Sequence, residues 1–253
     1  MKLSGYTLTR NCIELDYCFE ETISSLLGVC DEVVVCDAQS TDGTFERLYN
    51  LSLEEPKLRI VTYPWKDPVG EGPVWFTSWI NFAREHLSHE MQLQLDADEV
   101  VHDRSYEAIR NAVEKKEARW CERYNFWRDS THLAPEGHVC GSSIVRLGPS
   151  DLFMPSDEPH PEGEPEIKKI AVHGAPIEIF HYGFIRKKDS FYKKSKVVQE
   201  AFFGSCDERL LRAERNDTPF EDEFLFDGKV LKEFSGEHPE VAHKWLLDRN
   251  YKL

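Results

Sequence analysis

Apolar positions in the N-terminal part of the chain alternate between short continuous runs and spacings of three or four residues. The short runs have the length of buried strands and occupy residues 3–9, 32–37, 57–63 and 91–95. The wider spacings predict amphipathic helices over residues 14–27, 44–51 and 76–87. Strands and helices in this order form a parallel sheet with right-handed crossovers and helices on both faces. We therefore predict an α/β fold.

The C-terminal half has a less regular pattern. Strands are predicted over residues 119–127, 138–147 and 177–184. Residues 148–166 contain five prolines and four glutamates, which predicts a loop, and two or three helices are expected to close the chain. The pattern predicts a sheet-containing domain over residues 1–185 and a helical extension over residues 186–253 that packs on it.

The strand at 91–95 runs into a block of acidic residues, in the sequence LQLDADEVV of residues 93–101. Burying ionised carboxylates costs several kcal/mol unless a positive charge meets them. The block therefore lies either at a solvated strand end, as an ordinary charged turn, or next to a cation. An EF-hand loop that began at Asp96 would need glycine at its sixth position and glutamate at its twelfth, where this chain has Val101 and Glu107.

A phosphatase motif of the form D-x-D-x-[TV] also fits DADEV locally. It requires a second acidic pair after a later apolar strand, and the sequence has none. A third interpretation is a site for a metal and a nucleotide sugar. Such a site requires polar residues at the ends of earlier strands as well.

The strand at 32–37 also ends in an acidic residue, as this third interpretation requires. Asp37 closes the predicted strand 32–37, and the loop AQSTDGT of residues 38–44 follows it. Ligands of parallel sheets bind outside the carboxyl ends of the strands, so Asp37 and Asp96 are expected to line one crevice. Thr44 would begin the next helix, whose N-terminus suits an anion or a ribose hydroxyl. The glycine-rich phosphate loops of the common nucleotide-binding folds are absent from the sequence.

Composition excludes several other classes. The formal net charge of −15 argues against broad binding of nucleic acid. No apolar run approaches the roughly 18 residues of a membrane span, and the N-terminus lacks an apolar signal core. The seven cysteines have no C-x-x-C spacing. We expect reduced thiols in a cytoplasmic protein, with neither a zinc site nor a disulfide framework.

Four segments together resemble the family 2 glycosyltransferases of the GT-A fold. They are YTLTRN, CDEVVVCDAQSTDGT, LQLDADEVV, and IFHYGF followed by a basic helix, and the resemblance covers roughly residues 3–195. Gln39 departs from the family pattern, which commonly has a small residue there. The resemblance implies a GT-A nucleotide-diphospho-sugar transferase fold with a mostly parallel central sheet. It also implies a nucleotide-sugar donor and a divalent cation, Mn²⁺ or Mg²⁺.

The resemblance also assigns roles to individual residues. Asp98 and His181 are implied metal ligands, and Asp96 faces the ribose, a bridging water or the metal. The implied nucleotide-binding residues are Thr9, Arg10, Asn11, Asp37, Ser40, Asp42 and Asp96. A structural histidine at a strand end is the ordinary alternative for His181.

An inverting transfer needs a general base, which the family places between the D-x-D pair and the late histidine. Asp157 and Glu158 are the candidates in that window, with Asp157 ahead and Glu99 next, although acids in such a loop are ordinarily solvated. The acidic EDE of residues 221–223 falls after His181, in the wrong order. The run RKKDSFYKKSK of residues 186–196 has six basic residues. It forms either a solvated helix face or a contact for the diphosphate or an anionic acceptor.

The sequence therefore predicts a metal-dependent inverting glycosyltransferase with no membrane span. A UDP-sugar is the expected donor, and a glycan, a lipid-linked group or another hydroxyl compound is the acceptor. A nucleotidyltransferase on a similar sheet is the alternative enzyme, although TRNCIELD lacks the glycine-rich basic loop that such enzymes have after the first strand. A protein that binds a nucleotide sugar without catalysing a reaction is the alternative that is not an enzyme.

Overall fold

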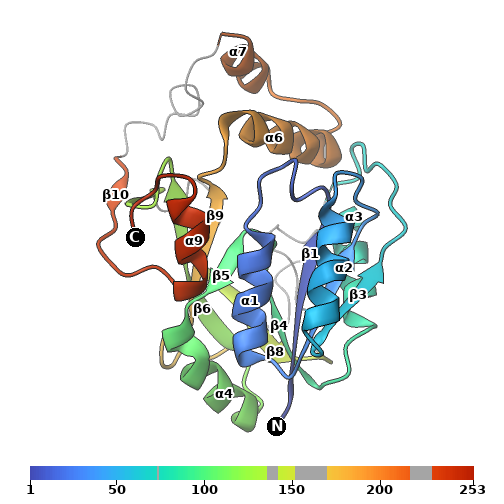
Figure 1. Cartoon of the computed structure of the whole chain (residues 1–253), viewed down its shortest axis with the longest axis vertical. Helices are drawn as coiled ribbons and strands as arrows, with labels where there is room; N and C mark the ends of the chain where they lie inside the picture. The colour runs from blue at the N-terminus through green and yellow to red at the C-terminus, as the bar shows by residue number, and fades with distance from the viewer. Residues whose placement is uncertain (73, 136–141, 152–169, 217–229) are drawn as a thin grey trace.

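Four parallel strands form one side of a mixed sheet. The computed structural model describes residues 1–72, 74–135, 142–151, 170–216 and 230–253 (Figure 1). Its N-terminal elements are β1 (Leu3–Thr9), α1 (Phe19–Val29), β2 (Glu32–Asp37), α2 (Thr44–Glu54), β3 (Leu58–Thr62), α3 (Val74–Arg84) and β4 (Met91–Gln94). The strands lie in the order β3-β2-β1-β4, and each neighbouring pair is parallel. The predicted α/β class and the parallel arrangement are confirmed.

The two faces of this parallel unit are covered by different helices. Val33 and Val35 of β2 belong to the apolar cluster that includes α1 and α2. Val34 and Cys36, which alternate with them, pack with Trp79 of α3 on the other face. Successive strand residues point to opposite faces, so a continuous apolar run is what a strand buried on both sides requires.

The second half of the chain adds an antiparallel part to the sheet. Its elements are β5 (Glu99–Val101), α4 (Tyr106–Lys115), β6 (Arg119–Trp127), β7 (His132–Leu133), β8 (Ser143–Pro149), β9 (Glu178–Phe184), α6 (Lys188–Phe203), α7 (Glu208–Asn216), β10 (Lys232–Glu233) and α9 (His243–Leu247). Short 3-10 helices occupy Asp103–Ser105 and Glu240–Ala242. Strand β8 joins the two parts because it pairs antiparallel with both β4 and β6.

Helix α1 begins later than the sequence pattern predicts. The prediction starts at residue 14, whereas the helix starts at Phe19. The preceding residues form turns instead, because the backbone N–H of Glu14 donates to Asp42 at 2.7 Å. Asn11 and Asp16 have φ angles of 48° and 55°, in the left-handed region that is incompatible with a continuing right-handed helix. The contact to Asp42 therefore overrides the local helical pattern.

Strand β5 and helix α4 are among the elements that were not predicted. Strand β5 has only three residues and merges in the sequence with the acidic block. Helix α4 buries Ala108, Ile109, Ala112 and Val113, whose spacing is helical and was available as a signal. Strand β5 pairs antiparallel with β9 and places Glu99 opposite His181, so it connects the acidic block to the second half of the sheet.

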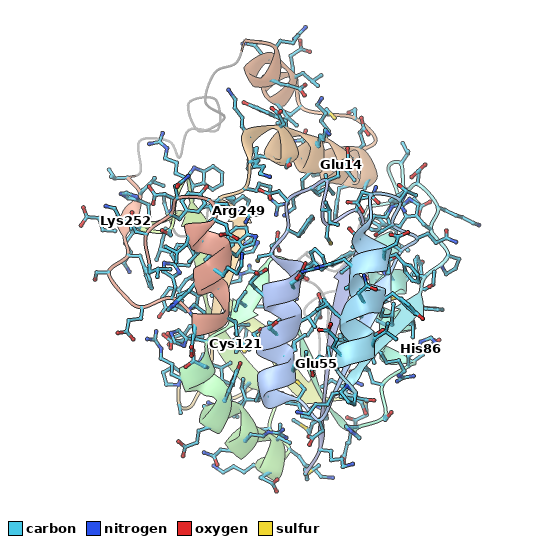
Figure 2. The ribbon with its side chains drawn as sticks, viewed as in Figure 1. Glu14, Glu55, His86, Cys121, Arg249 and Lys252 are labelled. Carbon is cyan, nitrogen blue, oxygen red and sulfur yellow. The ribbon has the colours of Figure 1, made fainter. Side chains whose placement is uncertain are left out.

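Helix α6 lies across the carboxyl ends of the parallel strands. Figure 1 shows it below α7 and above α1 and α3, and Figure 2 labels Glu14 next to it. The Ser190 hydroxyl donates to the Glu14 carbonyl at 2.9 Å. The N–H of Gly70 donates to the Glu200 carbonyl at 2.9 Å. Within the described ranges no helix has both the length and the apolar character needed to cross a bilayer.

The C-terminal residues close a second apolar cluster. Trp245 and Leu246 of α9 pack with Phe126 and Tyr182 of the antiparallel strands. His238 is buried beside them, where its Nδ1 accepts from the Tyr182 hydroxyl at 2.8 Å and its Nε2 donates to the Ser130 carbonyl at 2.9 Å. The neutral imidazole is therefore fully hydrogen-bonded in the folded protein. The division at residue 185 into a domain and an extension stays a prediction.

We predict that this histidine makes the fold sensitive to mild acid. Burial lowers the pKa of His238 from 6.5 to about 4. Between these values the His238 imidazole binds more protons in the unfolded chain than in the folded chain, so its contribution to the free energy of unfolding falls as the pH drops from about 6.5 towards 4. Urea unfolding at pH 7.0, 6.0 and 5.0 measures the slope. His238→Gln should flatten it, and the surface variant His132→Gln should not; equal slopes in all three proteins would contradict the prediction.

Candidate functional site

Two loops at the carboxyl ends of β1 and β2 interlock through Asp37. Its carboxylate is fully buried and accepts from the Thr9 hydroxyl at 3.1 Å, the Ser40 N–H at 2.9 Å and the Ser40 hydroxyl at 2.6 Å. These contacts satisfy the carboxylate, so Asp37 fixes the shape of the β2 loop. The predicted neighbours Thr9 and Ser40 are brought together with it.

Asn11 and Asp42 connect the same two loops from the outside. The backbone N–H of Asn11 donates to the Ser40 hydroxyl at 2.9 Å. The side-chain oxygen Oδ1 of Asn11 accepts from the backbone N–H of Thr41 at 2.9 Å. Burial raises the pKa of Asp42, but hydrogen bonds from the N–H of Glu14 and from Thr44 outweigh it and hold that pKa below the ordinary value. The left-handed backbone at Asn11 is therefore held by contacts on both sides.

Arg10 and Gln39 connect these loops to the residues after β3. The Arg10 guanidinium donates to the carbonyls of Ala38 and Gln39, at 2.6 Å each, and lies 4.4 Å from the centre of the Trp65 ring. The Gln39 side chain accepts from the Trp65 N–H at 3.1 Å. Gln39, the departure from the family pattern, thus ties the loop after β3 to the loop after β2.

The acidic block after β4 separates into three carboxylates with different surroundings. Asp98 is buried, and its Oδ2 accepts from Arg186 at 2.6 Å and from Lys194 at 2.8 Å. Burial alone would raise the pKa of Asp98, but the positive charges of Lys194 and Arg186 and the contact with His181 hold it well below its usual value. Asp98 is therefore ionised at neutral pH.

Glu99 contacts Asp96 and two buried arginines inside the sheet. Its Oε1 accepts from Arg123 and Arg146 at 3.0 Å each, and its Oε2 accepts from the Asp96 N–H at 3.0 Å. Burial raises the pKa of Glu99, but the two guanidinium charges outweigh this effect and lower it to about 2. Such a carboxylate takes no proton near neutral pH, so Glu99 is unsuitable as the general base.

Asp96 is the exposed member of the block. Its side chain is 30% exposed, and its Oδ2 accepts from Arg146 at 2.5 Å. Arg146 thus holds Asp96 and Glu99 together at the end of β4. The predicted contacts of Asp96 with a ribose, a bridging water or the metal stay predictions.

His181 faces Asp98 from β9. Its Nδ1 lies 2.8 Å from the Asn125 side-chain oxygen, which accepts a hydrogen bond and so leaves the Nε2 lone pair available. The Nε2 lies 3.5 Å from Oδ1 of Asp98. A Cβ at Gly183 would lie 2.4 Å from this Nε2 and 2.8 Å from Asp98 Oδ2. Glycine at 183 keeps room beside both ligand atoms.

Asp98 and His181 fit a divalent cation as a pair. Ligand atoms about 2.1 Å from one ion lie roughly 3.0–3.4 Å apart, close to the 3.5 Å between Oδ1 and Nε2. Within the described ranges, no group of three or more histidine, cysteine, aspartate or glutamate side chains gathers as a metal site. A site with two protein ligands is the type in which waters and substrate phosphates complete the coordination of Mg²⁺.

The sequence analysis did not identify the buried arginines as site residues. Arg146 and Arg123 are 0% and 1% exposed at the side chain, in strands that are otherwise rich in apolar residues. An arginine inside such a strand signals a buried anionic partner, although the sequence does not say which one. The predicted bases Asp157 and Glu158, and the acids at 221–223, lie outside the described residues.

No protein-family model and no curated protein matches this chain. Solved structures with a similar fold include S. aureus TarS in complex with UDP-GlcNAc, with 14% identity and a TM-score of 0.48 over 90% of this chain and 74% of that chain. The mannosyltransferase PcManGT from Pyrobaculum calidifontis, in complex with GDP-Man and Mn²⁺, has 15% identity and a TM-score of 0.47 over 98% and 68%. A putative glucose-1-phosphate thymidylyltransferase from Bacillus anthracis has 11% identity and a TM-score of 0.48 over 76% and 93%. At these values we base residue roles on contacts within this chain alone.

We predict that Glu99 stabilises the fold. Removing one partner of a buried ion pair leaves an uncompensated charge and costs about 3–5 kcal/mol. Glu99→Gln should therefore lower the free energy of unfolding by about 3 kcal/mol or more, whereas the exposed Glu122→Gln on β6 should leave it nearly unchanged. Urea denaturation followed by tryptophan fluorescence measures both. A loss below about 1 kcal/mol in Glu99→Gln would show that Arg123 and Arg146 do not depend on it.

Proposed function

We propose that this protein is a glycosyltransferase that moves a sugar from a nucleoside-diphosphate sugar to a hydroxyl acceptor with the help of a divalent cation. The observation that carries the proposal is the meeting of two sites at one sheet edge. The loops after β1 and β2 form a network of hydrogen bonds around Asp37, and Asp98 faces His181 beside the end of β4. Strand β1 lies between β2 and β4, so both sites belong to neighbouring parallel strands.

The chemistry of the transfer matches this arrangement. When the bond between the sugar and the diphosphate breaks, negative charge builds up on the leaving diphosphate. A divalent cation held by Asp98 and His181 would neutralise part of that charge as a Lewis acid. The Asp37 loops would hold the nucleoside, with Arg10 and Trp65 forming one side of its pocket. Asp96, exposed at the end of β4, would accept a ribose hydroxyl or a water.

The inverting course and the base are parts of the same proposal. An acceptor hydroxyl needs a carboxylate to take its proton as the new bond forms, which is worth about 10²–10⁴ in rate. Glu99 does not serve, because its pKa is about 2 and its oxygens are occupied. We retain Asp157, with Glu158 second, as the proposed base.

We predict that the nucleotide depends on the shape set by Asp37. Asp37→Asn keeps the size of the side chain but loses the charge that accepts from Thr9 and Ser40. Charge-assisted hydrogen bonds are worth about 1.5–3 kcal/mol each, so UDP affinity should fall by at least about tenfold. Titration calorimetry with UDP measures this change.

Asp31→Asn is the matched control for this prediction. Asp31 precedes β2 and also accepts a backbone N–H, from Leu3 at 2.8 Å, but it lies at the opposite end of the strand. The control should lose stability without losing UDP affinity. Equal affinity of both variants and the wild type for UDP would place the nucleotide elsewhere.

We predict that His181 supports the metal and that excess metal compensates for its loss. His181→Ala removes one ligand without touching the two ion pairs of Asp98. The Mn²⁺ concentration needed for half-maximal hydrolysis of a UDP-sugar should rise at least about tenfold, since even outer contacts of metal sites contribute that much. The surface variant His132→Ala is the control.

The same assay tests the proposed function itself. Wild-type protein should release UDP from at least one nucleotide sugar of a panel, and excess EDTA should stop this hydrolysis. Hydrolysis that continues undiminished in EDTA would rule out the metal-assisted mechanism, and no hydrolysis or transfer with any donor would rule out the enzyme.

A further inference from the structure

Lys194 is the contact of Asp98 that comes from a helix outside the sheet. It belongs to α6, and its Nζ lies 2.8 Å from Oδ2 of Asp98. The ammonium lies 5.1 Å from the centre of the Tyr17 ring and 6.0 Å from that of Phe184. The side chain is 21% exposed, whereas that of Asp98 is 4% exposed. Lys194 therefore stands between the buried carboxylate and the solvent.

Arg186 holds the same carboxylate oxygen in a different way. Its guanidinium donates to three acceptors, Asp98 at 2.6 Å, the Gly183 carbonyl at 2.8 Å and the Leu15 carbonyl at 2.6 Å. It is 1% exposed and lies 4.2 Å from the centre of the Tyr17 ring. Among the described residues, Lys194 donates only to Asp98. Arg186 is thus fixed by its three acceptors. Lys194 has a flexible side chain and needs to break only its hydrogen bond to Asp98 in order to move.

The charges around Asp98 favour such an exchange. One carboxylate is paired here with two cations, so the cluster of Asp98, Arg186 and Lys194 has one positive charge in excess. A divalent ion on Asp98 would add two more positive charges within a few ångströms, where repulsion between buried charges is strong. The fixed Arg186 cannot leave without losing two carbonyl acceptors, but Lys194 can turn towards solvent or towards an anion.

We propose that Lys194 is an exchangeable counter-ion of Asp98 that binds the diphosphate of the nucleotide. When a divalent cation takes Asp98, Lys194 moves from the carboxylate to the phosphate oxygens. With no metal present, Lys194 still attracts the diphosphate, so a nucleoside diphosphate binds weakly to the metal-free protein. This inference rests on the proposed function, because it assigns a ligand to the same site.

Two binding measurements on full-length protein test the inference without any activity assay. Lys194→Met should bind Mn²⁺ about tenfold or more tightly than the wild type, because a competing cation on Asp98 is gone. The same variant should bind UDP in EDTA about tenfold or more weakly, because a charge-assisted contact is lost. Titration calorimetry measures both. Lys194→Arg, which keeps the charge, should retain UDP binding in EDTA.

Lys193→Met is the matched control. Lys193 is the preceding residue of α6 and pairs with Glu14 at 2.8 Å on the exposed side. It should leave both affinities at the wild-type level. Thermal unfolding checks that Lys194→Met is folded, which is expected because Arg186 still pairs with Asp98.

The outcomes separate this inference from the proposed function. Wild-type affinities for Mn²⁺ and UDP in folded Lys194→Met, with UDP bound by both proteins, would overturn the exchange and leave the glycosyltransferase proposal intact. A loss of UDP binding in Lys194→Met that Lys194→Arg does not restore would also overturn it. Wild-type protein that binds no UDP in either Mn²⁺ or EDTA would overturn both proposals.

Discussion

The buried negative charge after β4 is the constraint that organises the rest of the molecule. Asp98 and Glu99 have side chains 4% and 0% exposed, and ionised carboxylates so far from water require cations. The cations come from four distant places: Arg123 from β6, Arg146 from β8, Arg186 from the residues after β9, and Lys194 from α6. These ion pairs bring the antiparallel part of the sheet, and the helix above it, to the end of a parallel strand.

A division of roles follows from this arrangement. The parallel strands contribute the polar loops around Asp37, whose hydrogen bonds are satisfied within the loops themselves. The antiparallel strands contribute buried charge and His181. Because most of these groups are held by several partners, the site is preorganised, which is what differential stabilisation of charge in a transition state requires. The single-bonded Lys194 is the exception in the described part of the site.

Sequence patterns predicted the parts of this structure that depend on local rules. The parallel strands follow from apolar runs, and the positions of Asp37 at the end of β2 and of Asp96 just after β4 follow from where those runs end. The late start of α1 could not be predicted, because it depends on a contact between Glu14 and Asp42. The pairing of Glu99 with Arg146 spans 47 positions, and no periodicity reveals a partner at that distance. Secondary structure can be predicted in large part from a single sequence, but ion pairs between distant residues cannot.

A buried metal ligand has a requirement that an exposed one lacks, since its charge must be balanced when the metal is absent. Arg186 and Lys194 meet this requirement at Asp98, and their presence weakens the site for any incoming cation. In the proposed exchange, a diphosphate that draws Lys194 away would remove part of this competition and so would raise the affinity of Asp98 for the metal. Linkage requires that the metal raise the affinity for the diphosphate by the same factor. Under the proposed function, ordinary ion pairing at one carboxylate would thus couple metal binding to donor binding, without any change in the sheet that holds them.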